Sequence, residues 1–126
     1  MPKARGQGRS NSGVYVGGLP EIQVLDSFGL EGKNNECGGL YGRRDPDVNM
    51  CLPPLVWQTF DVELTQPKRD AQGRPQENIR ATVRHNGVVI HENYDTGKKE
   101  SGPRGIHLQR HGNRVQYRNI WLVEPK

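Results

Sequence analysis

The chain has 126 residues, which is enough for one domain, because two separate cores would each have to be built from well under a hundred residues. Only 32% of the residues are hydrophobic and 6% are aromatic, while 16 Gly and 9 Pro interrupt the chain, so a long-helix bundle and a coiled coil are excluded and short strands joined by turns are favoured. The formal charge of +4 is scattered along the chain without interleaved aromatic residues that could stack on bases, so nucleic acid is not expected as a partner.

A glycine-containing break separates the first two predicted strands. The β-favouring run at 14–16 predicts a short strand, and the Gly-Gly-Leu-Pro sequence at 17–20 ends it. The second strand is predicted over 21–26, where two apolar residues alternate with Glu21 and Gln23. Because alternate residues of a strand point to opposite faces, burying the apolar pair presents a carboxylate and an amide together on the other face.

A long loop follows over 27–54, and it contains both cysteines of the chain, Cys37 and Cys51. Loops of this length usually have a function or are held by cross-links. Two cysteines alone do not make a zinc site, because structural zinc takes four Cys or His ligands and no histidine lies nearby at ligand spacing. A disulfide and a pair of buried thiols both remain open, and no metal or cofactor is expected.

A third strand is predicted over 57–64, where apolar and polar residues alternate. Phe60, Val62 and Leu64 fall on its apolar face, which is expected to pack on the core. The opposite face carries carboxylates, as the second strand does.

A hairpin is predicted from strands over 79–85 and 88–92, because they flank Asn86-Gly87, a turn sequence in which both positions tolerate positive φ. A two-residue turn there would pair Val83 with Ile90. The histidines that flank this turn are expected at the surface: His85 and His91.

A second hairpin is predicted around Gly112-Asn113, from strands over 106–111 and 114–123. One of its faces is apolar up to Tyr117, and the other carries histidine, glutamine and arginine side chains.

Together these strands predict a polar sheet face of a kind that binds sugars. An aromatic ring covers the apolar face of a pyranose, while carboxylates, amides and guanidinium groups bind its hydroxyls. The alternative is that the face is polar only because one side of an antiparallel sheet is solvated. The predicted face comprises Glu21, Gln23, Asp61, His107, Gln109, His111 and Arg118, with Trp57 as a stacking platform.

Six motifs, in this order, resemble the 3-keto-disaccharide hydrolase domain family over residues 5–124. The two cysteines, in a context of NMCLPP at 49–54, are similar to planctomycete forms of that family. The motifs are NSGVY at 11–15, EIQVLD at 21–26, CGGLYG at 37–42, PP at 53–54 with WQTFD at 57–61, RHNGV at 84–88 and LQxHGNxVxYRNIW at 108–121.

The resemblance implies an all-β fold, a concanavalin A-like antiparallel β-sandwich or jelly roll. Family members carry several more strands before the Asn-Ser-Gly motif, so residues 1–126 are expected to be a single domain that corresponds to the C-terminal portion of the sandwich. A sandwich without those strands exposes sheet edges, and a homo-oligomer is therefore expected.

The resemblance also implies a carbohydrate substrate and cleavage of a glycosidic bond in a sugar already oxidised to a ketone at C3. A carbohydrate-binding module without catalysis is the alternative. The family is typically exported, so a secreted or periplasmic location is implied, although this chain begins without the apolar stretch of a signal peptide. No run of about 18 apolar residues predicts a membrane span, and no membrane partner is expected.

For that reaction Glu21 is the predicted base or acid and His111 its proton-transfer partner. Export of the family, and a loop poor in apolar anchors, predict a disulfide between Cys37 and Cys51, with two buried free thiols as the alternative. The predicted substrate-binding residues are Gln23, Trp57, Gln109 and Arg118.

Overall fold

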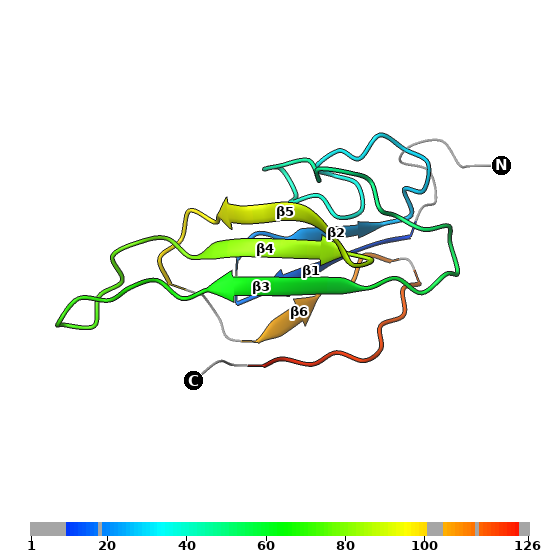
Figure 1. The fold of residues 1–126 in the computed structure, drawn as a ribbon. Coiled ribbons are helices and arrows are strands. Elements are labelled where there is room, and N and C mark those ends of the chain that lie inside the picture. The colour runs from blue at the N-terminus through cyan, green and yellow to red at the C-terminus, as the bar shows by residue number, and fades with distance from the viewer. Residues whose placement is uncertain (1–9, 18, 101–104, 113, 124–126) are drawn as a thin grey trace.

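The protein is described by a computed structural model, which covers residues 10–17, 19–100, 105–112 and 114–123. Two antiparallel sheets of three strands each face one another (Figure 1), with strand orders β2-β1-β6 and β3-β4-β5. This arrangement confirms the predicted all-β sandwich. No helix among the described residues is long and apolar enough to cross a membrane. The strands are β1 (Asn11–Val16), β2 (Ile22–Leu25), β3 (Phe60–Thr65), β4 (Arg80–His85), β5 (Val88–Asp95) and β6 (Ile106–Leu108).

The core lies between the sheets and is small. Ile22 and Leu40 contribute to it from one side and Val83 and Ile90 from the other, and all four are at most 3% exposed. Burying each such side chain stabilises the fold by roughly 1.5–3 kcal/mol. In β3 the predicted alternation is confirmed, because its apolar residues are half-buried and the residues between them are exposed. The residues packed around the core are Val14, Met50, Phe60, Val62 and Tyr94.

The hairpin of β4 and β5 turns at Asn86-Gly87 as predicted, with positive φ at both positions. Its register beyond the turn differs from the prediction, because Val83 lies opposite His91 and not opposite Ile90. A β-bulge at Ile90 accounts for the shift of one residue. Two consecutive residues of β5, Ile90 and His91, are therefore both buried.

The two histidines of this hairpin are fully buried, so the prediction that they lie at the surface is wrong. His85 stacks on Phe60 with ring centroids 4.2 Å apart, and its Nε2 lies 2.9 Å from Gln58 Oε1. His91 Nε2 lies 2.7 Å from the Gly38 carbonyl oxygen, and its Nδ1 accepts a hydrogen bond from Arg44 at 2.8 Å. His91 thus joins the long loop over 27–54 to the second sheet, and His85 joins that sheet to Gln58, beyond the loop. Burial lowers the pKa of both, and that of His85 falls to about 4.

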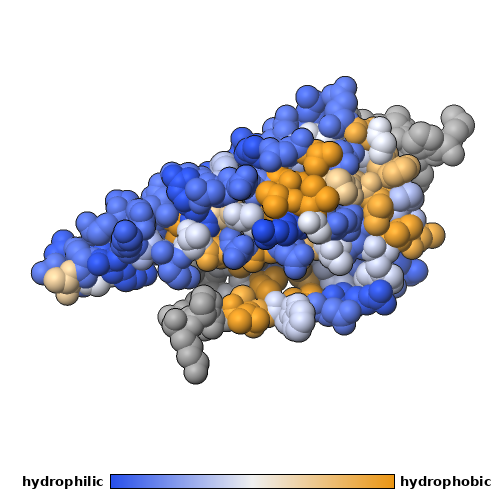
Figure 2. Space-filling view, viewed as in Figure 1, coloured by the Kyte–Doolittle hydropathy of each residue, from blue (hydrophilic) through white to orange (hydrophobic). Residues whose placement is uncertain are grey.

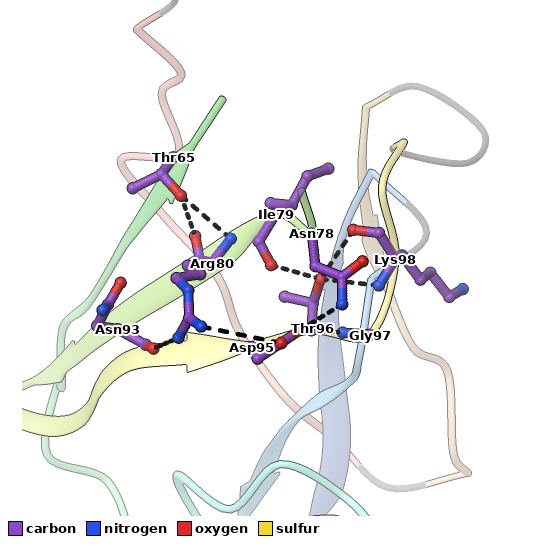
Figure 3. Close-up of polar contacts among 9 residues, drawn as sticks. All are labelled: Thr65, Asn78, Ile79, Arg80, Asn93, Asp95, Thr96, Gly97 and Lys98. Carbon is purple, nitrogen blue, oxygen red and sulfur yellow. Dashed lines mark hydrogen bonds and ion pairs between the residues drawn. The ribbon is translucent and has the colours of Figure 1, made fainter. Parts of the chain in front are cut away.

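Polar contacts close the open end of the same hairpin (Figure 3). The Thr96 hydroxyl donates to the Ile79 carbonyl at 2.7 Å, and Asp95 Oδ1 accepts from the Gly97 N–H at 2.8 Å and from Asn78 at 2.9 Å. The Gly97 N–H, followed by Asn78, lowers the pKa of Asp95. These bonds hold the chain that leaves β5 against the chain that enters β4.

The second predicted hairpin is wrong. Only Ile106–Leu108 form a strand, and this strand pairs with β1. Residues 114–123 form no strand, and the Tyr117 hydroxyl donates to Ser12 of β1 at 2.8 Å. The partner of β6 is therefore β1, which is distant in sequence, and not the neighbouring segment that the turn sequence at Gly112-Asn113 predicted.

Candidate functional site

The site is built on the outer face of the sheet that contains β1, β2 and β6. A short segment at 38–41 extends this sheet beside β2. The Gln23 N–H donates to the Gly39 carbonyl at 2.8 Å, and the Tyr41 N–H donates to the Glu21 carbonyl at 3.0 Å. Four chain segments therefore lie side by side, in the order 38–41, β2, β1 and β6.

One row of side chains crosses all four segments. Tyr15 lies opposite His107 in β6, and the antiparallel register that pairs Val14 with Ile22 places Glu21 opposite Tyr15 on the other side. Residues opposite one another in an antiparallel sheet share a face. We call this set the Glu21 row, and its members are Tyr41, Glu21, Tyr15 and His107.

Tyr15 is hydrogen-bonded to Glu21, with its hydroxyl donating to Oε2. The His107 ring meets the Tyr15 ring edge to face, with centroids 5.5 Å apart and an angle of 64° between the planes. The hydrogen bond to Glu21, with a further contribution from burial, raises the pKa of Tyr15 to about 12. At neutral pH Tyr15 is therefore a protonated donor next to a carboxylate acceptor.

The Glu21 carboxylate lies directly over Gly13, where there is no side chain to exclude it. A Cβ added at Gly13 would lie 2.6 Å from Glu21 Oε1, closer than atoms of real side chains approach. Gly13 is the glycine of the Asn-Ser-Gly motif, and its φ is not in the left-handed region, so backbone conformation is not what requires glycine. The structure shows instead that the Glu21 side chain occupies the space that a Cβ at position 13 would need.

The predicted binding residues differ in where they lie. Gln23 is on the same sheet, but it is only 3% exposed and its amide donates to Asn11 at 2.9 Å. Gln109 continues the pairing of β6, because its N–H donates to the Gly13 carbonyl at 2.9 Å. His111 lies three residues past β6 and is exposed.

Trp57 and Arg118 are brought together, with the guanidinium carbon 3.9 Å from the Trp57 ring centroid. This is a cation–π contact, so Arg118 covers one face of the ring. Asp61 lies on β3, in the second sheet, and the prediction that it shares a face with Glu21 is wrong. Hydrophobic alternation assigns faces within a strand, but it does not say which sheet the strand joins.

Sequence reasoning did not select Tyr15, Tyr41 or Gly13 as site residues. A signal for Tyr15 was present, because in the strand predicted over 14–16 it points to the face opposite Val14 and Val16. Tyr41 carried no such signal, since it belongs to the long loop. Its position follows only from the backbone hydrogen bonds between that loop and β2.

The two cysteines, both within the long loop, are buried free thiols that lie next to each other. Hydrogen bonding with Cys37, with contributions from Ser27 and Gln58, lowers the pKa of Cys51 to about 6. The same bond, together with burial, raises the pKa of Cys37. The predicted disulfide stays a prediction. Among the described residues no group of three or more His, Cys, Asp or Glu side chains is placed to hold a metal ion.

Two comparisons with known proteins found a match, one to a family model and one to a solved structure. The model of the 3-keto-alpha-glucoside-1,2-lyase-like domain matches residues 2–123. A solved structure from Parabacteroides distasonis ATCC 8503, described as a "putative glycosyl hydrolase", is 29% identical with a TM-score of 0.64. The match covers 88% of this chain and 52% of the other, so this chain spans about half the length of that protein. No curated protein matches the chain.

Proposed function

The chain belongs to the 3-keto-alpha-glucoside-1,2-lyase-like domain family, and from this premise we propose that it cleaves the glycosidic bond of 3-keto-glycosides. The family and the structural neighbour make it a glycosyl hydrolase-like domain of all-β fold. The observation that carries the finer proposal is the Glu21 row, in which a carboxylate with a tyrosine donor lies on the outer face of a sheet. A carboxylate held in this way suits a base that must abstract a proton from carbon.

The chemistry exploits the ketone at C3 of the sugar. The ketone acidifies the C2 proton, so a base removes it, and the electron pair passes to the C3 oxygen as an enolate that a hydrogen-bond donor stabilises. The enolate then expels the aglycone, as the C1–O bond breaks and the leaving oxygen takes a proton from an acid. Water finally adds across the C1–C2 double bond, which completes a net hydrolysis.

We assign Glu21 the role of base, and His111 that of proton-transfer partner. The remaining predicted residues would orient the sugar: Gln109 at the end of β6 and Arg118 with Trp57 on the chain segments beyond the sheets. Gln23 acts through Asn11, since its buried amide is already bonded to that side chain.

One assay tests this function. The protein is incubated with a 3-keto-glucoside and, separately, with the unoxidised parent glucoside, and both aglycone release and binding are followed. Release from the keto sugar alone supports the proposal, because only the ketone acidifies C2. Binding of both sugars without release from either would contradict it and would identify a carbohydrate-binding module.

We also propose a homo-oligomer. Among the described residues β3 pairs with β4 only, and its free edge faces Trp121–Val123 across a gap of about 450 Å³. Figure 2 shows apolar side chains exposed at the lower edge, beneath β3, where the described chain ends. Trp121 is 87% exposed and Val123 is 82% exposed. An unpaired strand beside exposed apolar side chains favours association, most simply about a two-fold axis.

We expect sedimentation equilibrium to show a dimer or larger assembly that dissociates on dilution through the micromolar range. Trp121→Glu should shift the population toward monomer, because a charge replaces an apolar side chain at the exposed edge. A wild-type monomer at every concentration, with a melting temperature independent of concentration, would show that the proposal is wrong.

We propose further that the protein works outside the cytoplasm, secreted or periplasmic, where Cys37 and Cys51 form a disulfide. The two thiols lie next to each other, an oxidising compartment supplies the oxidant, and closing this loop would stabilise the fold by roughly 3 kcal/mol. Thiol labelling of the unfolded, unreduced protein should therefore detect no reactive thiol, and labelling after reduction should detect both. Two reactive thiols before reduction would contradict the disulfide.

A further inference from the structure

We propose that Tyr15 is the positioning residue for Glu21 in the reaction, holding the carboxylate over the open space at Gly13. This inference deepens the proposed function and rests on it. It concerns a residue that touches Glu21, and it assigns Tyr15 no direct contact with the sugar.

The first argument is the hydrogen bond. The Tyr15 hydroxyl donates to Glu21 Oε2, and Glu21, the residue before β2, lies opposite Tyr15 when the register of β1 and β2 is continued by one residue. A glutamate has three side-chain torsions and, on the surface of a sheet, would sample several rotamers. A charge-assisted hydrogen bond from a rigid phenol selects among them.

The second argument is the room at Gly13. Glu21 Oε1, Cδ and Cγ would lie 2.6–2.8 Å from a Cβ at position 13, so the side chain lies directly over this glycine. The hydrogen bond from Tyr15 holds the carboxylate of Glu21 over β1, and Gly13 has no side chain that would block this position. The two residues, separated by one position in the same strand, therefore fix one location for the carboxylate.

The third argument is the support of the tyrosine ring. His107 meets the Tyr15 ring from the neighbouring strand β6, at a centroid distance of 5.5 Å. An edge-to-face contact of this kind restricts rotation of the ring. Glu21 beside β2, Tyr15 in β1 and His107 in β6 thus lie side by side across the sheet. The base is therefore positioned before a substrate binds.

A positioned base raises the rate of proton abstraction more than it raises affinity, because the geometry matters most in the transition state. Tyr15→Phe should therefore lower kcat by about ten- to a hundredfold, the range expected for loss of a hydrogen bond to a charged group. KM should stay within about threefold, since Tyr15 does not bind the sugar. Tyr94→Phe, which removes a hydroxyl from the second sheet, is the matched control and should leave both constants unchanged.

Gly13→Ala provides an independent variant, because it displaces the carboxylate without removing the hydrogen-bond donor. Its kcat should fall at least as far as that of Tyr15→Phe, while the far-ultraviolet circular dichroism stays that of the wild type. Wild-type kcat in either variant would overturn the proposal. A raised KM with unchanged kcat in Tyr15→Phe would also overturn it, because Tyr15 would then be a binding residue.

A second readout needs no substrate. In protein labelled with ¹³Cζ-tyrosine, the Tyr15 signal is identified by its loss in Tyr15→Phe. It should titrate near 12 in the wild type and move toward 10 in Glu21→Ala, because this variant has no acceptor for the Tyr15 hydroxyl. An unchanged midpoint would overturn the contact. If the wild type releases no aglycone, the proposed function fails, and this titration alone decides whether Tyr15 holds Glu21.

Discussion

Replacing Glu21 by Gln is expected to lower kcat for a 3-keto-glucoside by about a hundred- to ten-thousandfold, the usual contribution of a general base. An amide at this position still fits over Gly13 and can still accept a hydrogen bond from Tyr15, but it does not take a proton from C2. Substrate affinity should change little. Steady-state kinetics of aglycone release, compared with the wild type, measure the effect.

The matched control is Glu92→Gln, which makes the same chemical change on the exposed part of β5 in the second sheet. It should keep wild-type kcat. Substantial turnover in Glu21→Gln, or an equal loss in Glu92→Gln, would show that Glu21 is not the base. Exchange of the C2 proton with deuterated solvent provides a second measurement, because removal of the base should slow this exchange as well.

Acidification is expected to weaken the fold between pH 6.5 and about 4, by about 3 kcal/mol from His85 alone. The pKa of His85 is depressed in the folded protein, to about 4 from its ordinary 6.5, because the ring is buried against Phe60. Below pH 6.5 the unfolded chain binds a proton at this ring that the folded chain does not, so the stability present at neutral pH is lost as the pH falls. His91, also depressed, acts in the same direction.

Urea unfolding at pH 7 and at pH 4.5 measures this loss. His85→Asn should be less stable at both values, but the difference between them should be smaller than in the wild type, because the titrating ring is gone. Val62→Ala is the control, since it weakens the packing of the same sheet without removing a titrating group and should leave the difference unchanged. An equal pH dependence in wild type and His85→Asn would contradict the prediction.

Local signals predicted where the strands of the described residues lie but not all of their partners, and the strand predicted over 114–123 does not form. The alternation at 22–25 and at 60–65 depends on neighbouring residues, and so does the turn at Asn86-Gly87, so each could be recognised from a short window. The pairing of β6 with β1 could not, because it joins segments from opposite ends of the chain. The bulge at Ile90 could not be predicted from the sequence either, and because of it His91 is buried and not exposed as expected.

The candidate site was predicted only in part, because local patterns place a residue on a face of its strand but do not show which strands pair. Glu21 and His107 were placed on a polar face by their positions within strands, and they do meet in one row of one sheet. Asp61 had the same local pattern, but its strand joined the other sheet. Tyr41 reached the row through a loop whose backbone pairs with β2, and composition gives no indication of such pairing.

The contact between the two ends of the chain has a consequence for folding kinetics. Ser12 and Gln109 are hydrogen-bonded although they are 97 positions apart, whereas β4 and β5 are joined by a two-residue turn. Closing the longer loop costs more conformational entropy, so the β4–β5 hairpin can form early and β6 must dock late. The His107 side of the Glu21 row is then the last part of its sheet to be assembled, after the β4–β5 hairpin has formed.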